Sequence, residues 1–129
     1  MGGDVVILAA LIGRPLELPP SIVRRFPELA TVRWRRGGLP VRVASLVMGR
    51  ASAAAITLWR TVFLSPSAPL DAELLLHELR HVHQFEANVA FPLLYLWESL
   101  VHGYRRNRYE ADARAYATQR LGSSSDSLA

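Results

Sequence analysis

The 129-residue sequence contains no cysteine and no lysine. Without cysteine there can be no disulfide bond and no thiolate-bound zinc, so a bound metal would need ligands from His, Asp or Glu. All fifteen basic residues are arginine, which we interpret first as a compositional bias. The net charge of +4 would still permit attraction to acidic partners.

Long apolar runs are also missing. No stretch approaches the roughly eighteen apolar residues that a membrane span requires, so we expect no spanning segment. The run from Val5 to Ile12 is short, follows the acidic Asp4 and is closed by Gly13, a pattern that does not fit a secretory signal. We therefore expect a cytoplasmic protein whose first apolar run is a buried strand or, as the second choice, a short helix.

Half of the residues are hydrophobic, which suits one folded domain with a modest core. We expect this domain to cover residues 1–122, and residues 123–129 to form a disordered tail after Gly122 ends the last helix. The pattern predicts an α+β fold, with strands at 30–36 and 56–64, a strand or short helix at 41–48, and helices at 20–26, 71–85, 89–104 and 108–121. The apolar helix at 89–104 is expected in the core rather than on a membrane surface.

The motif that carries chemistry is His-Glu-x-x-His at residues 77–81. On a helix, His77 and His81 lie about 6 Å apart along the axis and about 40° apart around it, so both imidazoles can reach one metal ion. Glu78 lies about 100° from His77 and can reach a water molecule on the metal instead. Two histidine ligands beside one general base form the centre of a zinc hydrolase. Asp71 is placed to cap the N-terminus of this helix.

A catalytic zinc ion also needs a third protein ligand and an open position. His83 lies about 200° around the helix from His81 and should face away from the metal. Glu86 and Glu98 are also candidates for the third ligand, but their spacing from the motif favours neither. The remaining candidates are Glu110, on an alanine-rich helix that could pack closely, and His102, near the end of the apolar helix; we favour Glu110, but spacing leaves both open.

Three segments together resemble the gluzincin branch of the zincin-type zinc metallopeptidases. They are His-Glu-Leu-Arg-His-Val-His-Gln at 77–84, Gly-Tyr at 103–104, and Asn-Arg-Tyr-Glu-Ala-Asp-Ala-Arg-Ala-Tyr at 107–116. The chain looks most like small bacterial zincin-like domains and minimal gluzincins, over about residues 55–117. It departs from the family pattern at Arg108, where proline is frequent, and this affects the start of the helix rather than the ligand.

The resemblance implies a small zincin-like domain in which a short mixed β-sheet packs on an active-site helix, followed by two C-terminal helices. It implies one zinc ion bound by His77, His81 and Glu110. Glu78 would be the general base that activates water to hydrolyse peptide bonds. The strand at 56–64 would form the sheet edge, to which a peptide or protein substrate could add as an extra strand.

Further residues receive supporting roles from the same resemblance. Gln84 and Asp112 would support the metal-binding histidines by hydrogen bonding. Tyrosines could donate a hydrogen bond to the oxyanion that forms during hydrolysis, and the sequence does not choose among three of them: Tyr104, Tyr109 and Tyr116. Arg114, one turn after Glu110, could instead pair with that glutamate and give it a structural role.

Two other functions compete with the peptidase. A chain of this length has little room for a deep substrate cleft, so the domain could be a non-catalytic zinc-binding interaction module. Alternatively, an arginine patch with Trp34 for stacking could bind nucleic acid; its members are Arg24, Arg25, Arg33, Arg35 and Arg36. Because Arg33 and Arg35 alternate with apolar residues as on an ordinary exposed strand, we do not expect nucleic acid to be a partner.

Overall fold

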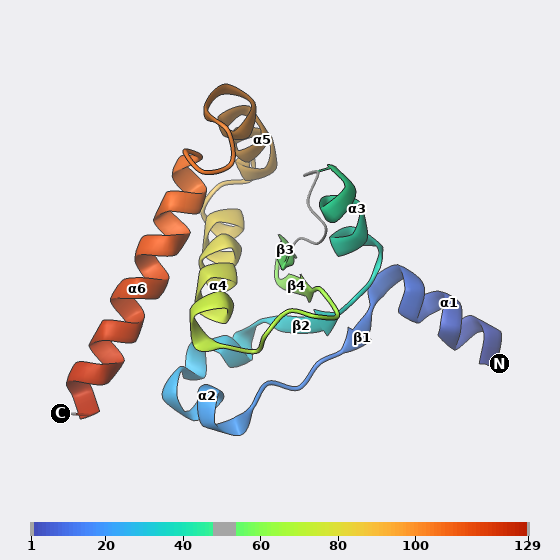
Figure 1. The fold of residues 1–129 in the computed structure, drawn as a ribbon, viewed down its shortest axis with the longest axis horizontal. Coiled ribbons are helices and arrows are strands. Elements are labelled where there is room, and N and C mark those ends of the chain that lie inside the picture. Colours follow the sequence, from blue (N-terminus) through green and yellow to red (C-terminus); the bar gives the residue numbers. More distant parts are fainter. Residues whose placement is uncertain (1, 48–53, 129) are drawn as a thin grey trace.

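The computed structural model describes residues 2–47 and 54–128 and has an α+β fold (Figure 1). Its elements in chain order are α1 (Gly2–Ile12), β1 (Arg14–Pro15), α2 (Pro20–Arg25), the 3-10 helix η1 (Pro27–Thr31), β2 (Arg33–Arg36), α3 (Leu39–Val47), β3 (Ala55–Leu58), β4 (Thr61–Leu64), α4 (Ala72–Ala87), α5 (Phe91–His102) and α6 (Arg108–Leu128).

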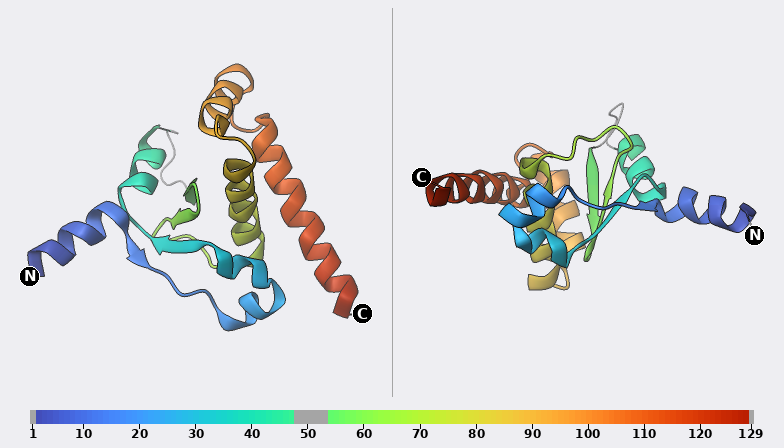
Figure 2. Two further views of the ribbon diagram at one scale, coloured as in Figure 1. Left: turned by 180° about the vertical axis from the view of Figure 1, so that it is seen from behind. Right: turned by 90° about the horizontal axis from the view of Figure 1, so that it is seen from below.

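The four strands form one mixed sheet in the order β1-β2-β4-β3. β2 and β4 are parallel, whereas β1 pairs with β2 and β3 pairs with β4 in the antiparallel sense. Figure 2 shows α4 and α6 on one side of this sheet and α3 and α1 on the other. The expected α+β domain, with a short mixed sheet packed on a helix and two further helices at the C-terminal end, is confirmed.

The core lies between α4, the sheet and α6. The side chain of Asp71 accepts a hydrogen bond of 2.8 Å from the backbone N–H of Leu74 and caps α4, as its position predicted. One face of α4 then packs on the sheet through its fully buried apolar residues, which are Leu75, Leu76, Leu79 and Val82. Ala113 and Ala117 of α6 are fully buried as well, and their small side chains let α6 approach α4 closely.

The first apolar run follows the second choice of its prediction, a short helix, and not the buried strand. Residues 5–12 belong to helix α1, and no residue of this helix is buried. A continuous apolar run does not distinguish a buried strand from a helix, and here it forms an exposed helix. The segment predicted as a strand or short helix at 41–48 is helical in α3, which ends at Val47; Met48 lies outside the described residues.

The strand predicted at 56–64 is a β-hairpin. β3 and β4 are antiparallel, with Leu58 opposite Thr61. The turn contains Trp59 and Arg60, and Trp59 has a positive φ of 55°. Because neither turn residue is glycine, asparagine or proline, the alternation of β-branched and aromatic residues runs through the turn without a sequence signal. The single-strand prediction was therefore wrong, although its position was correct.

The two C-terminal helices also differ in detail from the predictions. α6 continues through Gly122 to Leu128, so Gly122 does not end the helix. The backbone of the predicted tail is helical up to Leu128, and Ala129 lies outside the described residues. In α5, Phe91 is the only residue that is buried, so the predicted core helix is instead a largely exposed one.

Two arginine side chains of β2, those of Arg35 and Arg36, bind the protein itself. The guanidinium groups of Arg35 and Arg36 donate to backbone carbonyls, including those of Gly13 and Ser65. Trp34 is buried, and its indole N–H donates to the carbonyl of Leu29 at 2.8 Å. These contacts disfavour the nucleic-acid hypothesis because the only tryptophan in that group is not available for base stacking. No helix in the described part of the chain combines the length and hydropathy needed to cross a bilayer.

Candidate metal centre

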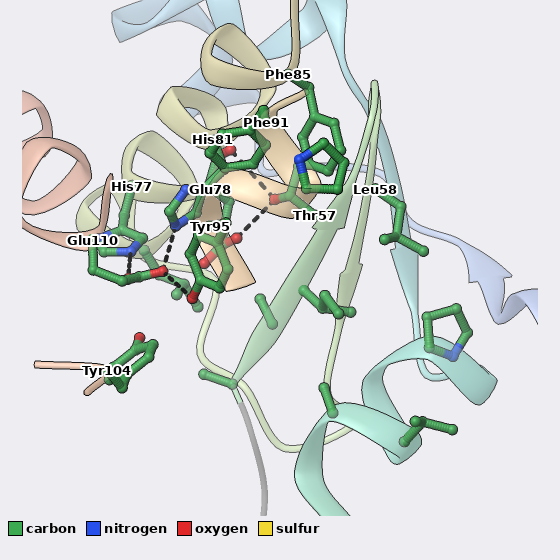
Figure 3. Close-up of a pocket in the computed structure, with 18 of the residues that line it drawn as sticks. Thr57, Leu58, His77, Glu78, His81, Phe85, Phe91, Tyr95, Tyr104 and Glu110 are labelled. Carbon is green, nitrogen blue, oxygen red and sulfur yellow. Dashed lines mark hydrogen bonds and ion pairs between the residues drawn. The ribbon is translucent and has the colours of Figure 1, made fainter. Parts of the chain in front are cut away.

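The motif residues lie on the side of α4 that faces the edge strand β3 (Figure 3). His77, Glu78 and His81 each offer one potential ligand atom, and these atoms all lie within 4.8 Å of one another. Glu78 and His81 are buried, and His77 is partly exposed. This His-Glu-His group could therefore hold a metal ion, and α4 positions it because the buried leucines of the same helix fix its orientation.

Glu110 at the start of α6 joins this group. One carboxylate oxygen, Oε2, lies 2.9 Å from Nε2 of His77, and the other, Oε1, lies 2.9 Å from Nε2 of His81. The Glu110 side chain is only 3% exposed. A single carboxylate thus spans both imidazoles, and the two Nε2 atoms point toward the same small volume.

Asn107 fixes Glu110 in this place. Its Oδ1 accepts hydrogen bonds from the backbone N–H groups of Tyr109 and Glu110, at 2.8 and 3.4 Å, and so caps α6. Its amide donates to the backbone carbonyl of Tyr95 and to the hydroxyl of Ser99 in α5. Asn107 is fully buried, so this one side chain joins α5 to the first turn of α6.

A series of side-chain hydrogen bonds supports His81 on the side of the ring away from Glu110. Its Nδ1 donates to Oε1 of Gln84 at 2.8 Å, and Nε2 of Gln84 donates to Oδ2 of Asp112 at 2.9 Å. Asp112 also accepts from Nε of Arg80 at 2.7 Å. The nitrogen of His81 that faces Glu110 is therefore Nε2, and its other nitrogen is occupied. Gln84 thus contacts His81 directly and Asp112 contacts Gln84, and the supporting role of both residues stays a prediction.

Two residues of the centre were not predicted from the sequence. The hydroxyl of Tyr95 in α5 donates to Oε1 of Glu110 at 2.9 Å. The hydroxyl of Thr57 in β3 donates to Oε2 of Glu78 at 2.8 Å. No motif marks either residue, because only the packing of α5 and β3 against α4 brings these hydroxyl groups to the two glutamates.

Burial and charge oppose each other at the centre. Burial alone would raise the pKa of Glu110, but hydrogen bonds from His77 and His81 outweigh it and hold that pKa well below its ordinary range. Burial alone would lower the pKa of His81, but the hydrogen bond with Glu110 and the charge of Glu78 raise it to about 9. Burial and the charge of Glu110 raise the pKa of Tyr95 far above its ordinary value. Glu110 is thus an anion and Tyr95 a neutral hydrogen-bond donor.

Other residues considered as ligands lie elsewhere. His83 stacks edge-on against Tyr116, with ring centroids 5.6 Å apart. The side chain of His102 is 51% exposed and lies 4.0 Å from Glu98. Glu86 forms an ion pair with Arg60. Among the contacts of the described residues, none joins His83, His102 or Glu86 to the two motif histidines.

The supporting candidates divide in the same way. Tyr104 lines the cavity beside the centre, whereas Tyr116 contacts His83 and Arg80 and does not line it. The guanidinium of Arg114 donates to the backbone carbonyl of Arg105 at 2.9 Å rather than to Glu110. The alternative in which Glu110 serves as the structural partner of Arg114 is therefore not what the folded chain shows.

A cavity of about 1040 Å³ opens beside the centre. Its lining includes the edge strand β3 and the preceding Ala54, together with residues of α3 and α5. Apolar side chains make up much of the lining, among them Leu39, Val43, Phe85 and Phe91. Among the described residues that line it, the charged groups are acidic or histidine, although the chain as a whole is basic.

The donor set fits a metal ion. Two imidazole nitrogens and a carboxylate meet beside a second carboxylate, and nitrogen and oxygen ligands of this kind suit a catalytic metal site in a chain without cysteine. Two carboxylates compete for the third position. Glu110 contacts both Nε2 atoms directly, whereas Glu78 is held by Thr57, so Glu110 is the better placed of the two to act as the third ligand.

Comparison with known proteins gives a family match. The family model of the eCIS core domain (extracellular contractile injection system core) matches residues 21–89, which is more than half of the 129-residue chain. The match runs from α2 to just beyond the end of α4 and includes His77, Glu78 and His81, and Glu110 lies outside it. Neither curated proteins nor solved structures give a match.

Proposed function

The chain belongs to the eCIS core domain family, and within that family we propose that it acts as a zinc-dependent metallopeptidase. The observation that carries this proposal is the position of Glu110. Its two carboxylate oxygens each lie 2.9 Å from Nε2 of one motif histidine, and Glu78 stands beside them. Two histidines, a distant glutamate and an adjacent carboxylate are what the gluzincin resemblance requires.

Each residue then has a defined role. His77, His81 and Glu110 would hold the zinc ion, and Tyr95 keeps Glu110 oriented through its hydrogen bond. Bound zinc would supply Lewis-acid activation of water and of the substrate carbonyl. Glu78 would take the proton of the attacking water and deliver it to the leaving amine.

Two hydroxyl groups would assist. Thr57 holds one oxygen of Glu78 at 2.8 Å, so the carboxylate keeps a fixed direction while it exchanges a proton. Tyr104 lines the cavity and is therefore the best placed of the predicted oxyanion donors. Tyr116, another of those predicted donors, is too remote because it contacts His83 on another side of α4.

The substrate would be an extended peptide. In the described sheet, β3 pairs with β4 on one side and its other edge is free. Residues 54–58 line the cavity along their length. An extended peptide could therefore add to β3 as a further strand and place a peptide bond beside Glu78. The apolar walls contributed by Val43, Phe85 and Phe91 favour apolar side chains on that peptide.

The test is hydrolysis of a broad peptide library by the zinc-loaded chain, compared with Glu78→Gln. This substitution preserves the shape of the side chain but removes its basicity. We expect cleavage by the unaltered chain, a loss of about a hundredfold or more in Glu78→Gln, and equal zinc content in both. Cleavage that survives in Glu78→Gln would contradict the assigned role of Glu78.

A non-catalytic zinc-binding interaction module is the second candidate. The family name favours it because that name describes a core domain rather than a peptidase. The same experiment separates the two functions. If the unaltered chain binds zinc through His77, His81 and Glu110 but cleaves no peptide of the library, the module is the better description.

A further inference from the structure

Three polar side chains of helix α5 point toward the rest of the protein. The hydroxyl of Tyr95 donates to Glu110, and the hydroxyl of Ser99 accepts from Asn107. Glu98 accepts a hydrogen bond from the backbone N–H of Arg108, and its side chain is only 15% exposed. The face of α5 that contacts the rest of the protein therefore contains most of its hydrogen-bonding side chains.

The opposite face of α5 is apolar and exposed. Its members are 52% to 74% exposed, and they are Leu93, Leu96, Trp97, Leu100 and Val101. Their spacing of three, four, seven and eight residues places them on one continuous stripe of the helix. Such a stripe points toward the core in an ordinary surface helix, and a contiguous exposed stripe of large apolar residues marks a contact surface.

The charges next to this stripe are positive. Gly103 ends α5, and Arg105 and Arg106 follow closely, both exposed. Within the contacts described, neither guanidinium group takes part in a hydrogen bond or an ion pair. The one carboxylate of α5 belongs to Glu98, which is turned inward, so no acidic side chain of the helix neutralises these arginines.

Other helices of the protein also carry exposed apolar residues. In Figure 1, α5 and α3 stand in the upper part of the molecule, and α1 projects to the right below α3. Leu39, Val43 and Leu46 of α3 are each at least 45% exposed. The apolar residues of α1 are exposed as well, and Arg14 lies just after that helix.

We propose that α5 docks this protein on the surface of a membrane that contains anionic lipids. A helix of twelve residues is about 18 Å long and cannot span a bilayer, but it can lie in the interface with its apolar face among the acyl chains. Trp97 suits the boundary between headgroups and chains. Arg105 and Arg106 are then placed to contact lipid phosphates.

The charge pattern favours this partner over a second copy of the chain. A second α5 packed on the first would present another apolar stripe and another pair of unpaired arginines, and no carboxylate to meet them. An anionic bilayer complements both features at once. Docking in this orientation would place α5, which lines the cavity through Phe91 and Tyr95, at the membrane surface.

Vesicle flotation of the full chain tests the proposal directly. The probes are vesicles of phosphatidylcholine alone and of phosphatidylcholine with phosphatidylglycerol. We expect binding to the anionic vesicles that weakens as salt rises, and little binding to the neutral ones. Trp97→Ser, and separately the pair Arg105→Gln with Arg106→Gln, should each reduce the apparent partition coefficient by about tenfold.

Trp59→Ser is the matched control because Trp59 and Trp97 are both 65% exposed. Trp59 lies in the β3–β4 turn and stacks on Phe85, away from the α5 stripe, so this variant should bind vesicles as the unaltered chain does. Circular dichroism should show that all variants are folded. A blue shift of the tryptophan emission on vesicle binding should disappear in Trp97→Ser but persist in Trp59→Ser.

Three results would overturn the proposal. The first is no binding to anionic vesicles at low salt. The second is an equal loss of binding in Trp59→Ser and Trp97→Ser. The third is a dimer in light scattering that Trp97→Ser dissociates while vesicle binding is absent, because the stripe would then be an interface between copies. Glu78→Gln should bind vesicles normally, so this test stands apart from the proposed peptidase activity.

Discussion

Asn107→Ala should destabilise the fold more than an ordinary polar substitution. Asn107 makes four hydrogen bonds: it accepts from the N–H groups of Tyr109 and Glu110 and donates to Tyr95 and Ser99. Loss of the helix cap costs about 1 kcal/mol, and leaving its partly buried partners in α5 unsatisfied costs about 1–3 kcal/mol more. We therefore expect the free energy of unfolding to fall by about 2–4 kcal/mol.

Chemical denaturation at fixed pH gives this quantity directly, and thermal unfolding should show a fall in Tm on the order of 10 °C. Asn88→Ala is the matched control, since Asn88 makes one exposed side-chain hydrogen bond, to the backbone N–H of Ala90. It should cost no more than about 1 kcal/mol.

One result would refute this reasoning. If Asn107→Ala is no more destabilising than Asn88→Ala, then the contacts that join α5 to α6 do not hold the first turn of α6 in place. The explanation of how Glu110 reaches the two histidines would then fail as well, because Asn107 caps the same turn that carries Glu110.

Substitutions at three other positions have equally definite expected outcomes. Thr57→Val should lower kcat by about tenfold with KM and zinc content unchanged, because the hydroxyl orients Glu78, the proposed general base. Thr57→Ser should restore kcat, and equal kinetics of the two variants would remove that role. Gln84→Leu should weaken zinc affinity by about tenfold to a hundredfold, as measured by competition with a chromogenic chelator, and unchanged affinity would show that the hydrogen bond to His81 is dispensable. Leu76→Ala, at a fully buried position of α4, should cost about 2–5 kcal/mol of unfolding free energy, and a cost below about 1 kcal/mol in denaturant titration would argue against the core as described.

Local signals predicted the elements that position the centre. The cap at Asp71 located the start of α4 correctly because capping depends on neighbouring residues of one helix. The alanines at 111, 113, 115 and 117 predicted that α6 packs closely; Ala113 and Ala117 are fully buried, whereas Ala111 and Ala115 are exposed. The preference for Glu110 rests largely on the family resemblance, and the fold brings this residue to both histidines; its role as a ligand remains a prediction.

Other features depend on information that a single sequence does not contain. The apolar runs of α1 and α5 have the composition of buried elements, yet both helices are mostly exposed. Composition reports how apolar a segment is and not what covers it. The turn at Trp59 lacks the residues that usually mark a hairpin, and Tyr95 and Thr57 reach the centre only through the packing of α5 and β3 against α4.

The metal content of the purified chain tests the central claim most directly. We expect elemental analysis to find about one zinc ion per chain, close to none in His77→Ala, His81→Ala and Glu110→Ala, and a full complement in Glu78→Gln. His102→Ala is the matched control, because His102 is exposed and lies outside the centre, and it should retain its zinc. Full zinc content in Glu110→Ala, or no zinc in the unaltered chain, would contradict the assignment of His77, His81 and Glu110 as a metal site.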